Sequence, residues 1–353
     1  MGDMGCIFCY TFSGITKYII KYLAKNRTIG LGCNKGINMF KGSMVAIVTP
    51  MNEDGSLDHM SLERLIEFHI ENKTDVIISV GTTGESATLD FDEHSEVIRS
   101  TLAIVNNRIP VIAGSGANST SEAIHLTQRS KELGADACLL VTPYYNKPTQ
   151  KGLYEHYKKI ADEVNIPQIL YNVPGRTSVD MLPDTVKNLS THPNIIGIKE
   201  ASGNLERSKE VLSKCAENMS IYTGDDKTSA RDILMGFKGN ISVTANIAPL
   251  EMHNMCKLAS IGKTVEAEKI NAKIDFPCTL DLRKYGYGYK KTDNIFELRG
   301  ICNHHGNHDD GHYTSFVKKA DMWYFCNDEI SPQYVSTETA LAAQAMILVY
   351  ERT

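Results

Sequence analysis

Eight short apolar runs recur along the chain every 20 to 35 residues or so, and this rhythm constrains the fold more than any other feature. They span 44–50, 75–81, 109–114, 137–143, 167–172, 195–200, 220–224 and 241–246. Continuous apolar runs of this length are typical of parallel strands that are buried on both faces. Amphipathic helical patterns separate the runs, and the clearest of them span 61–72, 92–106 and 121–134. We expect the first of these helices to begin at Ser61 and the third to end at Gly134.

Eight strand–helix units over about 220 residues predict an α/β protein with a (β/α)8 TIM barrel. A doubly wound open sheet is the alternative, but no G-x-G-x-x-G pattern follows the first strand. After about residue 265 the rhythm stops, and the sequence becomes richer in Tyr, His and Asn and reads as antiparallel strands. We therefore expect an N-terminal extension over 1–38, a barrel over 39–265 and a C-terminal lobe over 266–353.

Charge and cysteine content exclude several classes of protein. The 353 residues carry a net charge of −5, which argues against binding of nucleic acid, and no apolar stretch is long enough to span a membrane. Nine irregularly spaced cysteines are typical of a reduced, intracellular chain, and we expect a cytoplasmic protein. Basic, helically spaced residues in 1–38 indicate either a targeting segment or a poorly ordered extension, so organelle import stays open. Cys6 and Cys9 form a lone C-x-x-C without a second pair.

Polar residues at the ends of the runs form the candidate active site, because barrel enzymes carry their chemistry at the C-terminal ends of the strands. Lys199 ends the apolar run IIGIK. A lysine that faces the barrel interior would lose hydration, which lowers its pKa and makes the amine nucleophilic. The alternative is a lysine whose ammonium reaches the surface from a strand end.

Other strand ends bring hydroxyl, phenol and guanidinium groups to the same rim. Thr82 and Thr83 lie in the GTTGES loop, which either binds a carboxylate or is a simple turn. Tyr144, Tyr145 and Tyr171 supply phenols that either relay protons or pack at the rim. Arg176 follows a Val-Pro-Gly turn, where it could hold a carboxylate with two hydrogen bonds.

These motifs resemble the dihydrodipicolinate synthase (4-hydroxy-tetrahydrodipicolinate synthase) family. The similar segments include VGTTGESATL, TPYYNKPTQKGLYEHY, ILYNVPGRT, IIGIKEASGNL and ISVTANIAP, and the likeness is nearly collinear from about 39 to 265. The resemblance implies a class I aldolase-type lyase that condenses pyruvate with aspartate semialdehyde, at the entry to lysine synthesis by the diaminopimelate route. No metal or organic cofactor is implied, because the imine itself is the electron sink.

The resemblance also implies a role for each rim residue. Lys199 would form the Schiff base with pyruvate, and Tyr171 would shuttle protons above the imine. Thr82 would link Tyr171 to Tyr145, which a neighbouring subunit would contribute across a dimer interface. The substrate-binding residues would be Thr83 for the pyruvate carboxylate, Arg176 for the carboxylate of aspartate semialdehyde, and Gly224 and Ile241 along the pocket. We therefore expect a homo-oligomer, either a dimer or a tetramer.

Members of this family often carry a lysine feedback site at the dimer interface. The matching positions here are Ala87, His94, Asn118, Glu122 and Tyr144. Phe91 departs from the family pattern, which commonly has a histidine there. Feedback inhibition by lysine is therefore a hypothesis for this chain.

The C-terminal lobe departs from the family, which normally continues into further helices. From 269 onward the chain resembles the C-terminal part of a ubiquitin-specific protease, and the pattern at 303–313 followed by 323–327 carries the likeness. The resemblance implies a partial papain-like lobe in which His312 is the general base, Asn327 orients it, and the surface contacts ubiquitin.

The protease-like lobe has no cysteine box, because neither Cys9 nor Cys33 stands in a G-N-T-C-Y sequence. The alternative function, a deubiquitinating thiol protease, is therefore expected to be inactive. A third hypothesis is a non-catalytic binding protein with an inert barrel and a ubiquitin-binding tail. A barrel without its usual C-terminal helices is also expected to be less stable than a complete member of the family.

Overall fold

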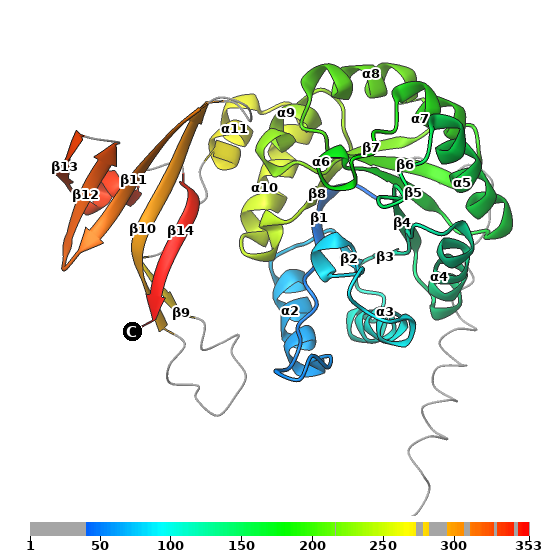
Figure 1. The fold of residues 1–353 in the computed structure, drawn as a ribbon, viewed down its shortest axis with the longest axis horizontal. Coiled ribbons are helices and arrows are strands. Elements are labelled where there is room, and N and C mark those ends of the chain that lie inside the picture. Colours follow the sequence, from blue (N-terminus) through cyan, green and yellow to red (C-terminus); the bar gives the residue numbers. More distant parts are fainter. Residues whose placement is uncertain are drawn as a thin grey trace, which may run out of the picture.

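The computed structural model describes two packed units, a closed barrel and an antiparallel sheet (Figure 1). The described residues are 40–215, 217–272, 278–281, 295–306, 311–327, 330–341 and 345–352. The expected N-terminal extension over 1–38, with Cys6 and Cys9, lies outside them. Within these ranges, no helix is both long enough and apolar enough to cross a membrane.

Eight parallel strands form the barrel, and their order around it is their order in the sequence. They are β1 (Gly42–Ala46), β2 (Val76–Ser79), β3 (Val111–Gly114), β4 (Ala137–Val141), β5 (Gln168–Asn172), β6 (Ile195–Glu200), β7 (Ser220–Thr223) and β8 (Gly239–Ser242). β1 closes the barrel by pairing with β8, with Gly42 opposite Gly239 and Val45 opposite Ser242. The predicted (β/α)8 barrel is confirmed, and each strand falls within or close to its predicted apolar run.

Helices follow the strands and cover the outside of the barrel (Figure 1). They are α2 (His59–Glu71), α3 (Phe91–Val105), α4 (Thr120–Leu133), α5 (Gln150–Glu163), α6 (Pro174–Thr177), α7 (Pro183–Leu189), α8 (Leu205–Cys215), α9 (Ser229–Leu234), α10 (Pro249–Ser260) and α11 (Thr264–Ala272). Three single-turn helices stand at strand ends: η1 (Thr82–Gly84), η2 (Asp226–Thr228) and η3 (Thr244–Asn246).

Side-chain and backbone caps set the helix ends. The prediction that Gly134 ends α4 is confirmed, because this glycine is the C-cap with a φ of 97° and its N–H bonds to Ser130 and Lys131 carbonyls. The prediction that Ser61 begins the first helix is wrong. Asp58 is the N-cap of α2, and its carboxylate accepts the Ser61 N–H at 2.9 Å. An aspartate therefore caps the first turn, and Ser61 lies inside it.

Alternate strand residues face two apolar cores. One set packs between the strands and the outer helices, and the other fills the barrel interior. Phe40 belongs to the interior set, and its carbonyl accepts a hydrogen bond from the Tyr222 hydroxyl at 3.2 Å. Tyr171 of β5 also belongs to the interior set, which directs its phenol into the barrel rather than toward the helices.

The barrel unit extends past the expected boundary at 265. That position lies inside α11, whose Ala267 is fully buried in the core between strands and helices. Asn271 near the end of α11 accepts a hydrogen bond from Ser229 at 2.7 Å and donates one to the Lys227 carbonyl at 2.9 Å. The boundary therefore lies after Ala272, because α11 buries its apolar side against the barrel.

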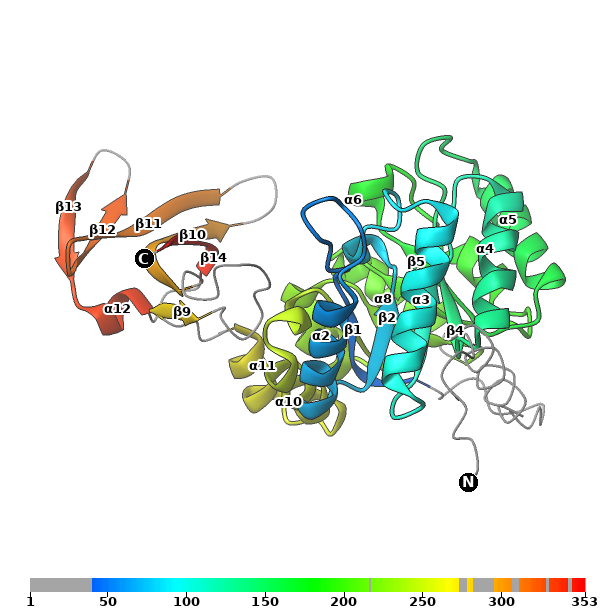
Figure 2. The same ribbon diagram turned by 90° about the horizontal axis from the view of Figure 1, so that it is seen from below.

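The C-terminal unit is an antiparallel sheet, as the sequence predicts. Its strands are β9 (Thr279–Asp281), β10 (Ile295–Gly306), β11 (Gly311–Lys319), β12 (Met322–Asn327), β13 (Ile330–Val335) and β14 (Ala345–Arg352), with one short helix, α12 (Thr337–Leu341). The strand order is β13-β12-β11-β10-β14, and β9 pairs with β10. Figures 1 and 2 both show this sheet apart from the barrel, beyond α11. Among its described side chains, the buried core residues are Leu298, Ile301, Phe316, Trp323 and Ala340.

Candidate active site

Lys199 lies inside the barrel at the end of β6, with only 4% of its surface exposed. Its register partner on β5 is Tyr171, and its Nζ lies 4.3 Å from the centroid of the Tyr171 ring. The alternative of a lysine that reaches the surface is therefore wrong. The interior position follows from strand alternation, because Lys199 shares its face with Tyr171.

Burial lowers the pKa of Lys199 to about 8. The Asp226 carboxylate opposes this shift by attraction, and the Arg176 guanidinium adds to it by repulsion. At pH 7 an amine with a pKa of 8 is about one-tenth deprotonated, against about 0.03% for an ordinary lysine. Lys199 is therefore prepared for nucleophilic attack on a carbonyl carbon.

Tyr171 is 6% exposed, and the Thr82 hydroxyl of η1 lies near its phenol. Burial raises the pKa of the Tyr171 phenol, while the positive charge of Arg176 and the nearby Thr82 hydroxyl act in the opposite direction. The phenol stays protonated near neutral pH, so it can donate a proton or a hydrogen bond beside the Lys199 amine.

Gly224 leaves the space that the Lys199 side chain occupies. A Cβ built on Gly224 would lie 2.5 Å from Lys199 Cε and 2.7 Å from the Ala201 Cβ. The Gly224 N–H donates to the Glu200 carbonyl at 2.7 Å, which fixes the end of β7 against β6. Any side chain at Gly224 would displace Lys199, so only glycine fits. Ile241, fully buried on β8, belongs to the barrel-interior core.

The other predicted substrate residues stand at the rim. Thr83 is half-buried in η1, and Arg176 is exposed on α6, one turn after β5. The structure thus gathers Lys199, Tyr171, Thr82, Thr83 and Arg176 at the C-terminal ends of β2, β5 and β6. A buried amine with a phenol beside it and a guanidinium at the rim suits an acidic carbonyl substrate.

Asp226 is a charged residue near Lys199, and no role was predicted for Asp226 from the sequence. Its carboxylate accepts hydrogen bonds from Asn240 Nδ2 at 2.7 Å, Val243 N at 3.1 Å and Thr244 N at 2.9 Å. These bonds tie the end of β7 to the loop after β8 and hold a negative charge near the amine. The GDD sequence at the end of β7 is the sequence feature that could have marked Asp226 as a site residue.

Tyr145 is 87% exposed in the single chain and lies on the loop after β4. Asn118 shapes this loop, because its Oδ1 accepts the N–H groups of Tyr144 at 2.7 Å and Tyr145 at 3.1 Å. The single chain does not bury the Tyr145 phenol against Tyr171. Its contribution to a neighbouring active site stays a prediction.

The residues predicted for a lysine feedback site differ in accessibility. Ala87, Glu122 and Tyr144 are exposed, and Asn118 is half-buried. His94 is buried, with its Nε2 2.8 Å from the Gly114 carbonyl oxygen, and burial lowers its pKa. A neutral His94 that is already bonded to the backbone is a less adaptable ligand for an incoming amino acid than the exposed members.

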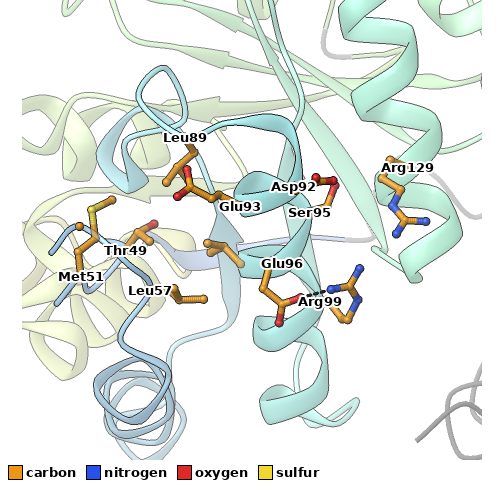
Figure 3. A pocket seen from close by; sticks show the side chains of 12 residues that line it. Thr49, Met51, Leu57, Leu89, Asp92, Glu93, Ser95, Glu96, Arg99 and Arg129 are labelled. Carbon is orange, nitrogen blue, oxygen red and sulfur yellow. Dashed lines mark hydrogen bonds and ion pairs between the residues drawn. The ribbon is translucent and has the colours of Figure 1, made fainter. Parts of the chain in front are cut away.

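A separate cavity of about 430 Å³ lies between the loop after β1 and helix α3 (Figure 3). Thr49, Met51 and Leu57 line one side, and charged residues of α3 with Arg129 of α4 line the other. None of the residues predicted for catalysis or substrate binding lines this cavity. It is therefore distinct from the site around Lys199.

In the antiparallel sheet, the His312 Nε2 and the Asn327 Oδ1 form a hydrogen bond between β11 and β12. These are the two residues predicted for the protease-like lobe. Cys9 and Cys33, neither of which stands in a cysteine box, lie outside the described residues. Across the part of the chain that the structure describes, no group of three His, Cys, Asp or Glu residues could hold a metal ion.

Comparison with known proteins places the barrel in one family. The Dihydrodipicolinate synthetase family model matches residues 39–280. The 4-hydroxy-tetrahydrodipicolinate synthases of Thioalkalivibrio sulfidiphilus and Stutzerimonas stutzeri are each 61% identical to this chain. Each match covers 67% of this chain and 81% of the relative. The dihydrodipicolinate synthase of Acinetobacter baumannii, solved with pyruvate, has a TM-score of 0.65 and 55% identity, covering 65% of this chain and 79% of that one. The chain therefore belongs to the dihydrodipicolinate synthetase family.

Proposed function

We propose that this chain condenses pyruvate with aspartate semialdehyde to give 4-hydroxy-tetrahydrodipicolinate, in lysine synthesis by the diaminopimelate route. The observation that carries the proposal is the buried Lys199 amine, whose pKa is lowered to about 8 and whose Nζ lies 4.3 Å from the Tyr171 ring. Relatives that are 61% identical carry the name of this synthase, and a solved relative was obtained with pyruvate. The enzyme is a class I aldolase-type lyase.

The neutral Lys199 amine attacks the ketone carbon of pyruvate, and loss of water gives a protonated imine. The imine accepts electrons when a proton leaves the pyruvate methyl carbon, which produces an enamine. The enamine carbon attacks the aldehyde of aspartate semialdehyde, and the oxygen takes up a proton. The amino group of the second substrate then displaces Lys199, which closes the ring and frees the enzyme. The imine serves as the electron sink, so the mechanism uses no metal or organic cofactor.

The rim residues bind and orient the two substrates in this proposal. Thr83 binds the pyruvate carboxylate, and Arg176 binds the carboxylate of aspartate semialdehyde. Tyr171 exchanges protons with the reacting atoms and is linked through Thr82 to Tyr145 of a neighbouring subunit. Gly224 and Ile241 line the pocket. The exposure of Tyr145, 87% in one chain, supports a homo-oligomer, a dimer or a tetramer, in which a neighbouring subunit supplies this phenol.

Borohydride reduction in the presence of pyruvate tests the proposal. Reduction converts the imine to a stable secondary amine, and peptide mass spectrometry should locate the adduct on Lys199. The Lys199→Arg variant is the matched control, because it keeps the positive charge but cannot form the imine under these conditions. An adduct on another lysine, or no adduct in the wild-type chain, would overturn the mechanism.

Feedback by lysine is a further part of the proposal, with Ala87, His94, Asn118, Glu122 and Tyr144 as the binding residues. The exposed positions of Ala87, Glu122 and Tyr144 would allow an amino acid to approach from solvent. A titration with lysine should lower the rate of the wild-type enzyme and should have less effect on Glu122→Gln. A rate that does not respond to lysine would contradict the proposed feedback inhibition.

A second candidate function concerns the antiparallel sheet. The hydrogen bond between His312 and Asn327 favours a partial papain-like lobe of the ubiquitin-specific protease type. Without a cysteine box we expect no hydrolysis, and a role in contacting ubiquitin is the remaining proposal. A ubiquitin thiol-reactive probe should leave the chain unlabelled. Capture of ubiquitin by a chain that is inert to pyruvate would instead favour a non-catalytic binding protein.

A further inference from the structure

Behind the two strands that carry Lys199 and Tyr171, four polar side chains form a hydrogen-bonded network, which we call the β5–β6 network: Asn172, Asp180, Glu200 and Arg207. Successive side chains of a strand point to opposite faces. Because Tyr171 and Lys199 face the barrel interior, Asn172 and Glu200 face outward. The register pairs Tyr171 with Lys199 and Asn172 with Glu200, so the network begins one residue from the reacting groups.

Asn172 is the centre of the network and is fully buried. Its Nδ2 donates to Glu200 Oε2 at 3.1 Å and to Asp180 Oδ1 at 3.0 Å. Its Oδ1 accepts the N–H of Met181 at 2.9 Å. One amide therefore joins β5, β6 and the segment after α6, and both of its donors and its acceptor are used.

Charged residues complete the network on both sides of Asn172. Arg207 of α8 donates to both carboxylate oxygens of Asp180, at 2.8 and 2.7 Å, and to the Met181 carbonyl at 3.1 Å. Glu200, which is 3% exposed, also accepts the Ser202 N–H at 2.8 Å. The guanidinium offsets the charge of the carboxylates, so the buried Asn172 and Glu200 and the more exposed Asp180 are satisfied as a unit.

We infer that Asn172 is a positioning residue for the reaction proposed above. By bonding to Glu200 it fixes the ends of β5 and β6 against each other, and this sets the distance between Tyr171 and Lys199. By bonding to Asp180 and Met181 it also anchors the segment that follows Arg176. The inference rests on the proposed function, and it assigns to this amide the alignment of the imine, the phenol and the carboxylate-binding arginine.

The Asn172→Leu variant tests the inference, because leucine has a similar volume but neither donates nor accepts. Gln168→Leu is the matched control. Gln168 lies on the same strand, is 1% exposed, and donates its side-chain amide to the Val164 carbonyl at 3.1 Å, but it stands at the opposite end of the strand from Tyr171. Both variants should lose thermal stability. Only Asn172→Leu should lower kcat by about tenfold or more when both are assayed well below their melting temperatures.

The pH profile of borohydride trapping gives a second readout that a purely structural role would not change. The charged and titratable groups around Lys199 are Tyr171 on β5, Arg176 on α6, Asp226 on η2 and Tyr222, the register partner of Lys199 on β7, whose hydroxyl donates to the Phe40 carbonyl. Asn172→Leu keeps these groups in the chain but loosens the alignment of β5 and β6, which lets water reach the amine, so the midpoint should move upward toward that of an ordinary lysine. Gln168→Leu should keep the wild-type midpoint.

Each outcome separates the inference from the proposed function. A wild-type chain without a pyruvate adduct on Lys199 would refute the function itself. A wild-type adduct together with equal kcat and equal pH midpoints in the two leucine variants would overturn the positioning role alone. If Asn172→Leu does not fold, Asn172→Asp, which keeps the size and the acceptor but loses both donors, should show the same fall in kcat relative to Gln168→Leu.

Discussion

At the residue scale, Lys199 destabilises the fold in which it acts. Its pKa is lowered to about 8 in the folded state from an ordinary value of 10.5, so the unfolded chain binds this proton more tightly. The resulting loss in the free energy of unfolding is complete below pH 8 and is relieved as the pH rises toward 10.5. At about 1.4 kcal/mol for each pH unit it amounts to about 3 kcal/mol.

Replacing Lys199 with methionine should therefore stabilise the chain while abolishing the pyruvate adduct. We expect the free energy of unfolding at pH 7 to rise by as much as about 3 kcal/mol, because the buried ammonium is removed. Denaturant unfolding at pH 7 and at pH 10 would measure this. The gain should shrink at pH 10, and a gain that is equal at both pH values would contradict the assignment of the penalty to Lys199.

Asp226 should shift the pKa of the Lys199 amine in the direction opposite to the shift caused by burial. Its negative charge raises the pKa of Lys199, so Asp226→Asn should lower the midpoint of pyruvate-dependent trapping by about half a pH unit or more. Asp225→Asn is the control, since it makes the same change one residue away, where the carboxylate caps the N–H of Lys227 at 2.9 Å. Equal midpoints in both variants would show that Asp226 serves only to join β7 to the loop after β8.

At the scale of elements, the loop after β4 is held in shape by Asn118. Its Oδ1 accepts two successive backbone N–H groups, those of Tyr144 and Tyr145. Asn118→Ala should free this loop and lower kcat several-fold, because Tyr145 would lose its orientation toward the neighbouring subunit. Asn118→Asp keeps the acceptor and should retain most of the activity. Steady-state rates that match in all three proteins would mean that Tyr145 takes no part in the reaction.

The elements themselves were largely predictable from the sequence, and the reasons are local. Continuous apolar runs and helical periodicity identified all eight barrel strands, and Gly134 identified a helix end. Periodicity alone did not orient Lys199, because a strand buried on both faces has no polar side that marks the outside. The rule that barrel enzymes carry their active sites at the C-terminal ends of the strands indicated that orientation. The N-cap of α2 was misplaced because Asp58 and Ser61 are both good capping residues.

Contacts between distant segments could not be predicted in the same way. The β5–β6 network joins Asn172, Glu200 and Arg207 through side chains on three elements, and no local pattern marks such residues as partners. The end of the barrel could be given from the sequence only as a region near 265–275, since α11 has a weak helical pattern and is fixed by the burial of Ala267. Both features depend on tertiary packing.

At the scale of the whole molecule, the two units differ in the buried apolar side chains that the structure describes. Among the side chains that the structure describes, the barrel has two extensive cores, whereas the antiparallel sheet has five buried core residues and leaves Val317, Met322, Ile330 and Tyr334 exposed. A small core supplies little stability after the entropy of folding is subtracted. We therefore expect the sheet to unfold before the barrel.

The single tryptophan of the chain allows this order to be measured. Trp323 is 2% exposed in the core of the sheet, so its fluorescence reports on that unit alone. On heating, the emission should shift to longer wavelength at a lower temperature than that at which helical circular dichroism and pyruvate trapping on Lys199 are lost, because most described helices belong to the barrel. The variant Trp323→Phe should keep the later transition and lose the earlier signal. A single transition seen at one temperature by all three measurements would show that the sheet and the barrel unfold as one cooperative unit.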